Sequence, residues 1–71
     1  MVVNTNLLML LLRELESNLA CGQIRREDAV PADDNALTMV HEAGVGTSLS
    51  PTVDEVRHAL KRALEVLAAS K

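Results

Sequence analysis

Aromatic side chains are missing from this 71-residue sequence, which contains no Phe, Tyr or Trp. A buried core must therefore be aliphatic, built from the Leu, Val, Ala and Met that supply most of its 48% hydrophobic content. This apolar content is too high for a chain that stays disordered. The missing aromatics also remove the platforms on which single-stranded nucleic acids stack their bases, so that class of binding protein is disfavoured.

Cysteine occurs once, at Cys21. A single cysteine excludes an intramolecular disulfide, and with two separated histidines it does not supply a tetrahedral zinc site. We therefore expect no metal and no cofactor. A lone thiol is also more typical of a reducing compartment than of a secreted protein, so we expect a cytoplasmic location.

Long hydrophobic runs are absent as well. The longest purely apolar run covers residues 7–12, whereas a membrane-spanning helix needs about 20 apolar residues. No basic residue precedes this run, and Arg13 and Glu14 follow it directly, which is not the pattern of a signal peptide. We expect no membrane segment, and the net charge of −3 opposes binding of phosphates over the surface as a whole.

The short length favours association with another subunit. The sequence predicts a single helical domain over residues 1–71. The core of so small a domain rarely supplies more than about 3–5 kcal/mol. Without a disulfide or a metal, self-association is the remaining source of additional stability.

The spacing of apolar residues predicts an all-α fold with three helices, at about residues 6–21, 34–43 and 51–69. These helices would form a small bundle completed by homodimerisation. The first has an apolar stripe at helical spacing: Leu8, Leu11, Leu12, Leu15 and Leu19. Asn4, Thr5 or Asn6 could cap its start, and Gly22 is placed to end it.

The second and third helices also have recognisable starts. Asp33 or Asp34 could cap the second helix, and Thr52 and Glu55 have the spacing of a capping box before the third. The third helix has an apolar stripe of its own: Val53, Val56, Leu60, Ala63, Leu64 and Leu67. We find no alternation of period two, which is the pattern of a strand.

The first helix carries more apolar side chains than its stripe accounts for. Leu7, Met9 and Leu10 point to its flanks and back, so its first two turns are apolar nearly all round. We expect a homodimer or partner interface at these residues, with Leu11 and Leu15 behind them. The favoured function is therefore a small non-enzymatic regulator or adaptor that acts by protein–protein interaction through this leucine-rich face.

No residue pattern in the sequence indicates catalysis. Cys21 falls at a helix C-terminus, where the dipole disfavours a thiolate, and we expect it to be a buried or half-buried apolar residue. His41 and His58 fall on different helices and in no catalytic motif, so we expect them at the surface or at an interface. We predict that the protein is not an enzyme and assign no catalytic residue.

A basic face on the third helix gives an alternative function, a small DNA-binding transcriptional regulator. Its candidate contacts to nucleic acid are Arg25, Arg26, Arg57, Lys61 and Arg62. Asp54 and Glu65 lie among them at i, i+3 and i, i+4 spacings, as on an ordinary solvated face. A helix-turn-helix is disfavoured because the connection before the third helix is longer than the usual turn.

Three stretches together resemble one known family. They are Asn18, Leu19 and Gly22, then residues 37–41, then residues 54–60. In these stretches, which span most of the chain from Leu12 onward, the sequence resembles the YmgB/AriR family of small helical bacterial biofilm regulators. It departs from the family in the glycine-containing link 44–50 and in lacking aromatics near the C-terminus. The resemblance implies a homodimer that regulates biofilm or stress genes through protein partners, leaves DNA contact open, and implies no catalytic residues.

Overall fold

The computed structural model describes residues 4–69, and it contains three helices: α1 (Thr5–Ala20), α2 (Asn35–Glu42) and α3 (Val53–Ala69). The predicted all-α class and number of helices are confirmed, and each helix begins and ends within two residues of its expected bounds. Within residues 4–69, the one extended pairing is an isolated bridge between Ala29 and Thr52. None of the helices in this range has the length and hydropathy needed to cross a bilayer.

A polar side chain fixes the start of α1, and a glycine fixes its end. Asn4 is the N-cap among the three expected candidates, and its Oδ1 accepts hydrogen bonds from the backbone N–H groups of Asn6 (2.8 Å) and Leu7 (3.4 Å). The helix ends before Gly22, which has a φ of +79°. Only glycine adopts this left-handed conformation without strain, so Gly22 terminates α1 as expected.

The starts of α2 and α3 follow two different patterns. Asp34 caps α2, with its Oδ1 accepting a hydrogen bond from the Ala36 N–H at 2.9 Å. Before α3, the Thr52 Oγ1 accepts from the Glu55 N–H at 3.3 Å, which is one half of the expected capping box. The other half is wrong, because the Glu55 carboxylate accepts from the Ser48 backbone N–H (2.7 Å) and hydroxyl (2.9 Å) instead. The loop 43–52 is therefore tied to the first turn of α3.

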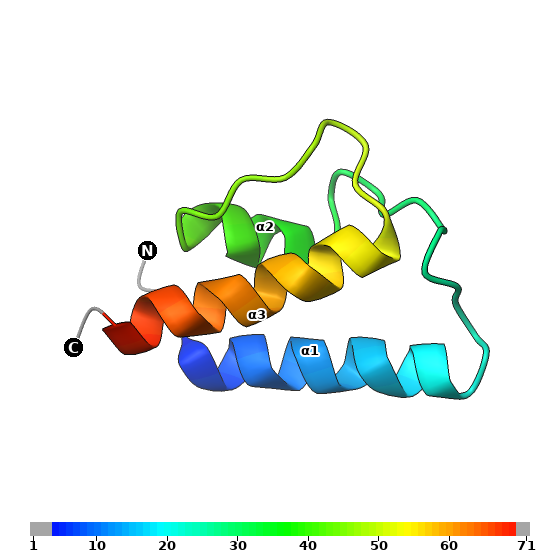
Figure 1. Ribbon diagram of the computed structural model, residues 1–71, viewed down its shortest axis with the longest axis horizontal. Coiled ribbons are helices and arrows are strands. Elements are labelled where there is room, and N and C mark those ends of the chain that lie inside the picture. The colour runs from blue at the N-terminus through cyan, green and yellow to red at the C-terminus, as the bar shows by residue number, and fades with distance from the viewer. Residues whose placement is uncertain (1–3, 70–71) are drawn as a thin grey trace.

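In the bundle, α3 is the central helix. Figure 1 shows α1 and α2 on opposite sides of it, and each packs more extensively on α3 than on the other. The buried apolar residues come mainly from α2 and α3: Leu8, Ala36, Leu37, Met39, Val40, Val45, Val53, Val56, Ala59, Leu60 and Ala63. Of these, Leu8 alone belongs to α1.

The segment after α1 is held against the start of α3 by backbone hydrogen bonds. The Val53 N–H donates to the Asp28 carbonyl at 2.8 Å, and the Asp54 N–H donates to the Arg26 carbonyl at 3.0 Å. The Val30 N–H returns a bond to the Pro51 carbonyl at 3.0 Å. These bonds position residues 26–30 beside α3 and close one end of the space between α1 and α2.

Candidate interaction site

The predicted interface residues of α1 divide into an exposed set and a half-buried set. Leu7, Met9 and Leu10 are 42%, 49% and 59% exposed, so none of them is covered by the rest of the chain. Leu11 and Leu15 are partly buried and pack against the core. The division follows the spacing, because Leu11 and Leu15 belong to the same helical stripe as the fully buried Leu8.

The exposed residues do not all lie on one side of α1. At about 100° per residue, Leu10 is about 60° from Leu7 around the helix axis, whereas Met9 is about 200° from Leu7. Leu7 and Leu10 therefore share one edge, which we call the outer edge of α1, and Met9 lies on the opposite flank. The expected patch is thus two surfaces separated by the buried Leu8.

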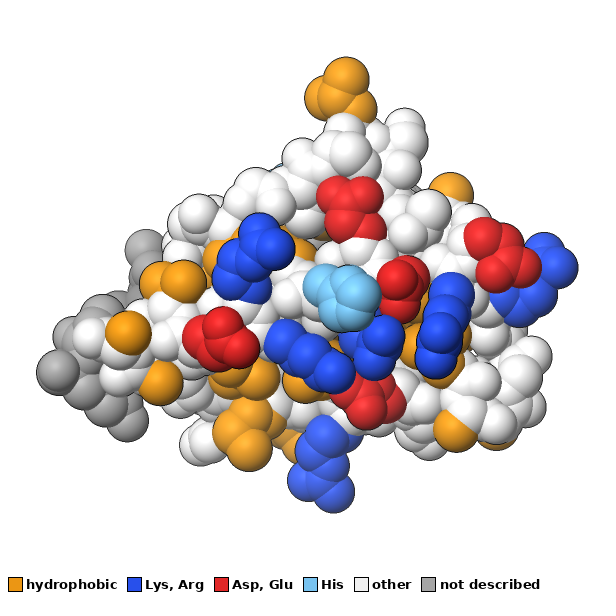
Figure 2. Space-filling model, in the orientation of Figure 1, with side chains coloured by type: hydrophobic (Ala, Val, Ile, Leu, Met, Phe, Trp, Pro, Cys, Tyr) orange, Lys and Arg blue, Asp and Glu red, His pale blue; other side chains and the backbone are white. Residues whose placement is uncertain are grey.

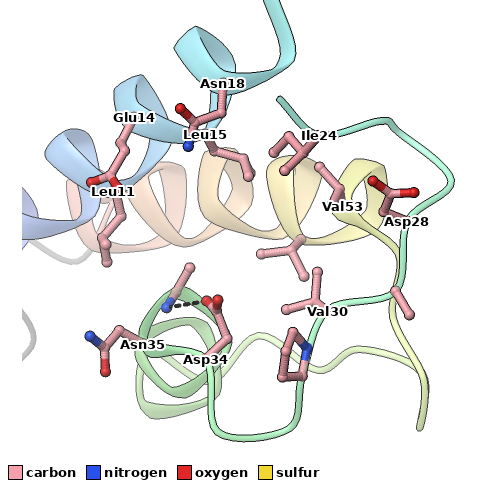
Figure 3. A pocket seen from close by; sticks show the side chains of 14 residues that line it. Leu11, Glu14, Leu15, Asn18, Ile24, Asp28, Val30, Asp34, Asn35 and Val53 are labelled. Atoms are coloured by element: carbon pink, nitrogen blue, oxygen red, sulfur yellow. Dashed lines mark hydrogen bonds between the residues drawn. The ribbon is translucent and has the colours of Figure 1, made fainter. Parts of the chain in front are cut away.

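A groove lies between α1 and α2 on the side of Leu7, and its deeper part is a hollow of about 440 Å³. In Figure 3, Leu11 and Leu15 of α1 point toward it from one side, Asp34 and Asn35 lie on the other, and α3 forms its back wall. The apolar side chains that line this part are Leu11, Leu15, Ile24, Ala29, Val30, Pro31, Ala36, Val53 and Val56. The groove exists because α1 and α2 both pack on α3 and make little contact with each other.

The groove continues along α1 past Leu11. A second hollow of about 330 Å³ is lined by Leu7, Leu11, Asn35, Thr38, Met39 and Glu42. Leu11 and Asn35 line both hollows, so the two parts are adjoining stretches of one groove, the α1/α2 groove. Leu7 stands at its open end, where the groove meets the outer edge of α1.

The polar rim of the α1/α2 groove is acidic. Its carboxylates are Glu14, Asp28, Asp34 and Glu42, and no Lys or Arg of residues 4–69 lines either hollow. Asp34 is occupied as the cap of α2, and Asp28 accepts a hydrogen bond from the Arg25 N–H at 2.9 Å. The carboxylates of Glu14 and Glu42 make no hydrogen bond or ion pair with any residue that the structure describes. The groove therefore combines an apolar floor with uncompensated negative charge.

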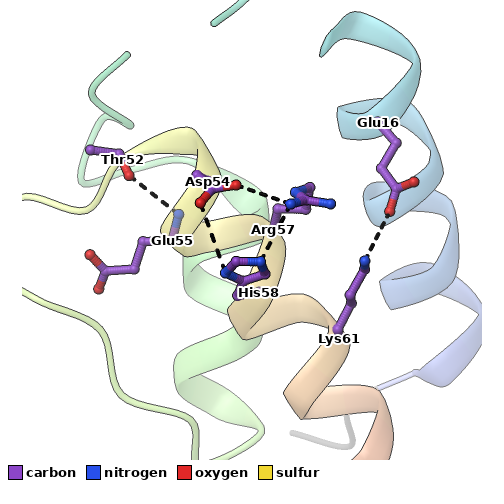
Figure 4. Close-up of polar contacts among 7 residues, drawn as sticks. All are labelled: Glu16, Thr52, Asp54, Glu55, Arg57, His58 and Lys61. Carbon is purple, nitrogen blue, oxygen red and sulfur yellow. Dashed lines mark hydrogen bonds and ion pairs between the residues drawn. The ribbon is translucent and has the colours of Figure 1, made fainter. Parts of the chain in front are cut away.

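The basic residues expected to contact nucleic acid are largely paired with acids. Arg57 Nη2 lies 3.1 Å from Asp54 Oδ1, as the i, i+3 spacing indicates. Lys61 Nζ lies 3.9 Å from Glu16 Oε1 of α1, rather than at the expected partner Glu65. Figure 4 shows this link between the helices, and Figure 2 shows acids and bases interleaved on the face that carries α3. This face has no continuous basic surface.

The two remaining arginines after α1 differ in their pairing. Arg25 Nε lies 3.6 Å from Glu27 and 3.4 Å from Asp28, whereas the Arg26 side chain has no ion pair within residues 4–69. Arg25, Arg26 and Arg57 line a hollow of about 450 Å³ that Glu16 also borders. The Arg57 Nε is buried beside it without a hydrogen-bond partner among the described residues. Arg62 is exposed on α3 and takes no part in this hollow.

Hydrogen bonding shifts two carboxyl groups at the start of α3. The pKa of Asp54 lies below its ordinary value, mainly because Arg57 donates a hydrogen bond to the carboxylate. The pKa of Glu55 is lowered chiefly by the hydrogen bond from the Ser48 backbone N–H, with the Ser48 hydroxyl adding to it. Both groups stay ionised at neutral pH and serve to fix the first turn of α3.

The remaining candidates for chemistry are separate from one another. Cys21 is exposed, so the expectation that it is buried or half-buried is wrong; the end of α1 projects beyond α3 and leaves it uncovered. His41 and His58 are exposed, with His41 Nε2 lying 3.0 Å from Thr47 Oγ1. Within residues 4–69, no three His, Cys, Asp or Glu side chains are arranged to hold a metal ion.

Comparison with known proteins finds no matching family model, no matching curated protein and no matching solved structure.

Proposed function

We propose that this protein is a small non-enzymatic interaction protein, a regulator or adaptor that associates through α1 with a second copy of itself and with a protein partner. The observation that carries the proposal is the exposure of Leu7 and Leu10 along the outer edge of α1, next to an apolar groove. A fully buried leucine contributes about 1.5–3 kcal/mol relative to an exposed one, so covering this edge would add substantially to a marginal core.

One further feature supports this class of function, and another concerns the location of the protein. The resemblance to the YmgB/AriR family agrees with a homodimeric regulator that acts through protein partners. The single exposed thiol of Cys21 is compatible with a reducing compartment, and we propose a cytoplasmic location on that basis.

The outer edge is tested with the double variant Leu7→Glu/Leu10→Glu. Two carboxylates at a dimer interface would be desolvated on association, so we expect the variant to remain monomeric at concentrations where the wild type dimerises. The matched control is Gln23→Glu/Leu49→Glu, which adds the same charge at two exposed positions outside the outer edge of α1. An unchanged mass in solution and an unchanged stability of the Leu7/Leu10 variant would show that the outer edge is not the interface.

A second candidate function is binding to DNA through α3 and the segment after α1. The observation that favours it is the hollow lined by Arg25, Arg26 and Arg57, where the Arg57 Nε has no partner. It predicts binding to duplex DNA that weakens steeply with salt and is lost when the arginines of this hollow are replaced together, in Arg25→Gln/Arg26→Gln/Arg57→Gln. Binding that survives these changes would exclude this function. We place it second because acids already pair with Arg25, Arg57 and Lys61.

A further inference from the structure

The α1/α2 groove has the dimensions of a docking site for a helix. Its lining residues on α1 run from Leu7 to Asn18, which at a rise of about 1.5 Å per residue corresponds to about 16 Å, or three helical turns. Its walls are the two helices α1 and α2, and α3 closes its back. A further helix laid in this space would pack against all three and complete a four-helix arrangement.

The lining of the groove indicates which face of a helix it would accept. The floor is aliphatic and is formed deep in the groove by Leu15, Val53 and Val56. A helix with apolar side chains at i, i+3, i+4 and i+7 would bury them on such a floor. The rim is polar, so the flanks of the bound helix would remain in contact with water and with the rim carboxylates.

The charge of the rim determines which charged side chains are favoured on the flanks of the bound helix. Glu14 of α1 and Glu42 of α2 lie on the two sides of the groove, and neither is paired with a described residue. No basic side chain from residues 4–69 lines the groove to offset them. Lys or Arg on both flanks of the bound helix would be attracted, and acidic flanks would be repelled.

The helices of this chain do not meet this description. The helix α1 has exposed leucines, but its charged residues are Arg13, Glu14 and Glu16, which give it an acidic balance. The helix α3 is more basic, but its apolar stripe is already buried in the core. Neither α1 nor α3 of a second copy therefore joins an exposed apolar stripe to basic flanks.

We infer that the α1/α2 groove binds a basic amphipathic helix of a partner protein, with the partner's apolar stripe on the floor and its Lys or Arg side chains at Glu14 and Glu42. This inference rests on the proposed function and specifies the chemistry of the partner. Self-association would use the outer edge of α1, and the partner helix would use the groove beside it.

The test is the binding of two synthetic helical peptides to the full chain, followed by fluorescence anisotropy. Both peptides have 18 residues, with leucines at i, i+3, i+4 and i+7 spacing; one has lysines on its polar face and the other has glutamates. We expect the lysine peptide to bind at least about tenfold more tightly, with a preference that decreases as salt is added.

The variant Glu14→Lys/Glu42→Lys tests whether the lysine peptide binds in the α1/α2 groove. Both positions are exposed, so the reversal should leave the fold intact while weakening the lysine peptide at least about tenfold. The matched control Glu27→Lys/Glu65→Lys makes the same change in net charge at exposed positions outside the groove. It should reduce binding less than about threefold, because only the general field of the protein changes.

Several results would overturn the inference: no binding of either peptide, equal binding of both, or equal losses in the groove variant and its control. A change in the mass of the protein itself in the single variant Glu42→Lys would also overturn it, because Glu42 lies on α2, off the outer edge, and the groove would then be occupied by a second copy. The proposed function fails separately, through the Leu7→Glu/Leu10→Glu variant. If that variant loses self-association while no peptide binds, the proposed function holds and the inference about the groove is wrong.

Discussion

The helices α1 and α3 have nearly the same length but bury their apolar residues to different extents. In α3, Val53, Val56, Ala59, Leu60 and Ala63 are all buried, whereas in α1 only Leu8 is. The apolar side chains of α1 are mostly leucine and so are larger than those of α3, but this does not give α1 the larger share of the core. The difference arises because α3 packs between two helices and α1 packs mainly against one. The helix with fewer neighbours retains an apolar surface available for binding.

The largest expected difference between α3 and α1 is in how much a truncated leucine lowers the free energy of unfolding. Leu60 of α3 is fully buried, so Leu60→Ala should destabilise the protein by about 2–5 kcal/mol. Leu10 of α1 is 59% exposed, so Leu10→Ala should change the stability of the monomer by less than about 0.5 kcal/mol. Urea denaturation at low protein concentration measures both values. Similar losses in the two variants would mean that α1 contributes to the core as much as α3 does.

A smaller effect is expected at the N-terminus of α1. Because Leu8 is the one fully buried side chain of α1, the helix depends more on its cap than α3 does, and Asn4→Ala should cost about 0.5–2 kcal/mol. Asn6→Ala is the control, since Asn6 is exposed and its side chain makes no hydrogen bond within residues 4–69. Circular dichroism during thermal unfolding compares the two variants. Equal melting temperatures would show that the cap does not hold α1.

The smallest effect on stability is expected from the hydrogen bonds that Ser48 donates to Glu55 in the first turn of α3. The lowered pKa of Glu55 means that its ionised form stabilises the fold at neutral pH, and that this contribution is lost as the pH falls through the folded-state pKa. Ser48→Ala removes the hydroxyl donor and leaves the stronger backbone bond. NMR titration should therefore show the pKa of Glu55 raised only part of the way to its ordinary value. The stability difference from wild type should vanish in acid, and a difference that persists there would have another cause.

Local signals in the sequence predict most of the fold. Asn4, Asp34 and Gly22 act through neighbours within a few residues, so their roles can be predicted without knowledge of the tertiary structure. The apolar stripe of α3 is likewise periodic, and its expected members Val56, Leu60 and Ala63 are buried. At these positions expectation and structure agree, whereas the spacing of Thr52 and Glu55 predicted only half of the capping box correctly.

Features that depend on how the helices pack could not be predicted from spacing. The α1/α2 groove forms because α1 and α2 lie on different sides of α3, and no local pattern specifies that arrangement. The same is true of the ion pair between Lys61 and Glu16, whose members are distant in sequence. Leu7, Met9 and Leu10 could be identified as surplus, and placed on two sides of α1, from helical spacing alone. The position of Leu7 beside the groove depends on how α1 and α2 pack on α3.

Self-association through α1 is tested most directly by the mass of the wild-type protein in solution at several concentrations. Sedimentation equilibrium should show a mass that rises from that of one chain toward that of two as the concentration increases, because the outer edge at Leu7 and Leu10 is buried on association. A mass that remains that of a single chain over the whole range would show that the protein does not self-associate through α1.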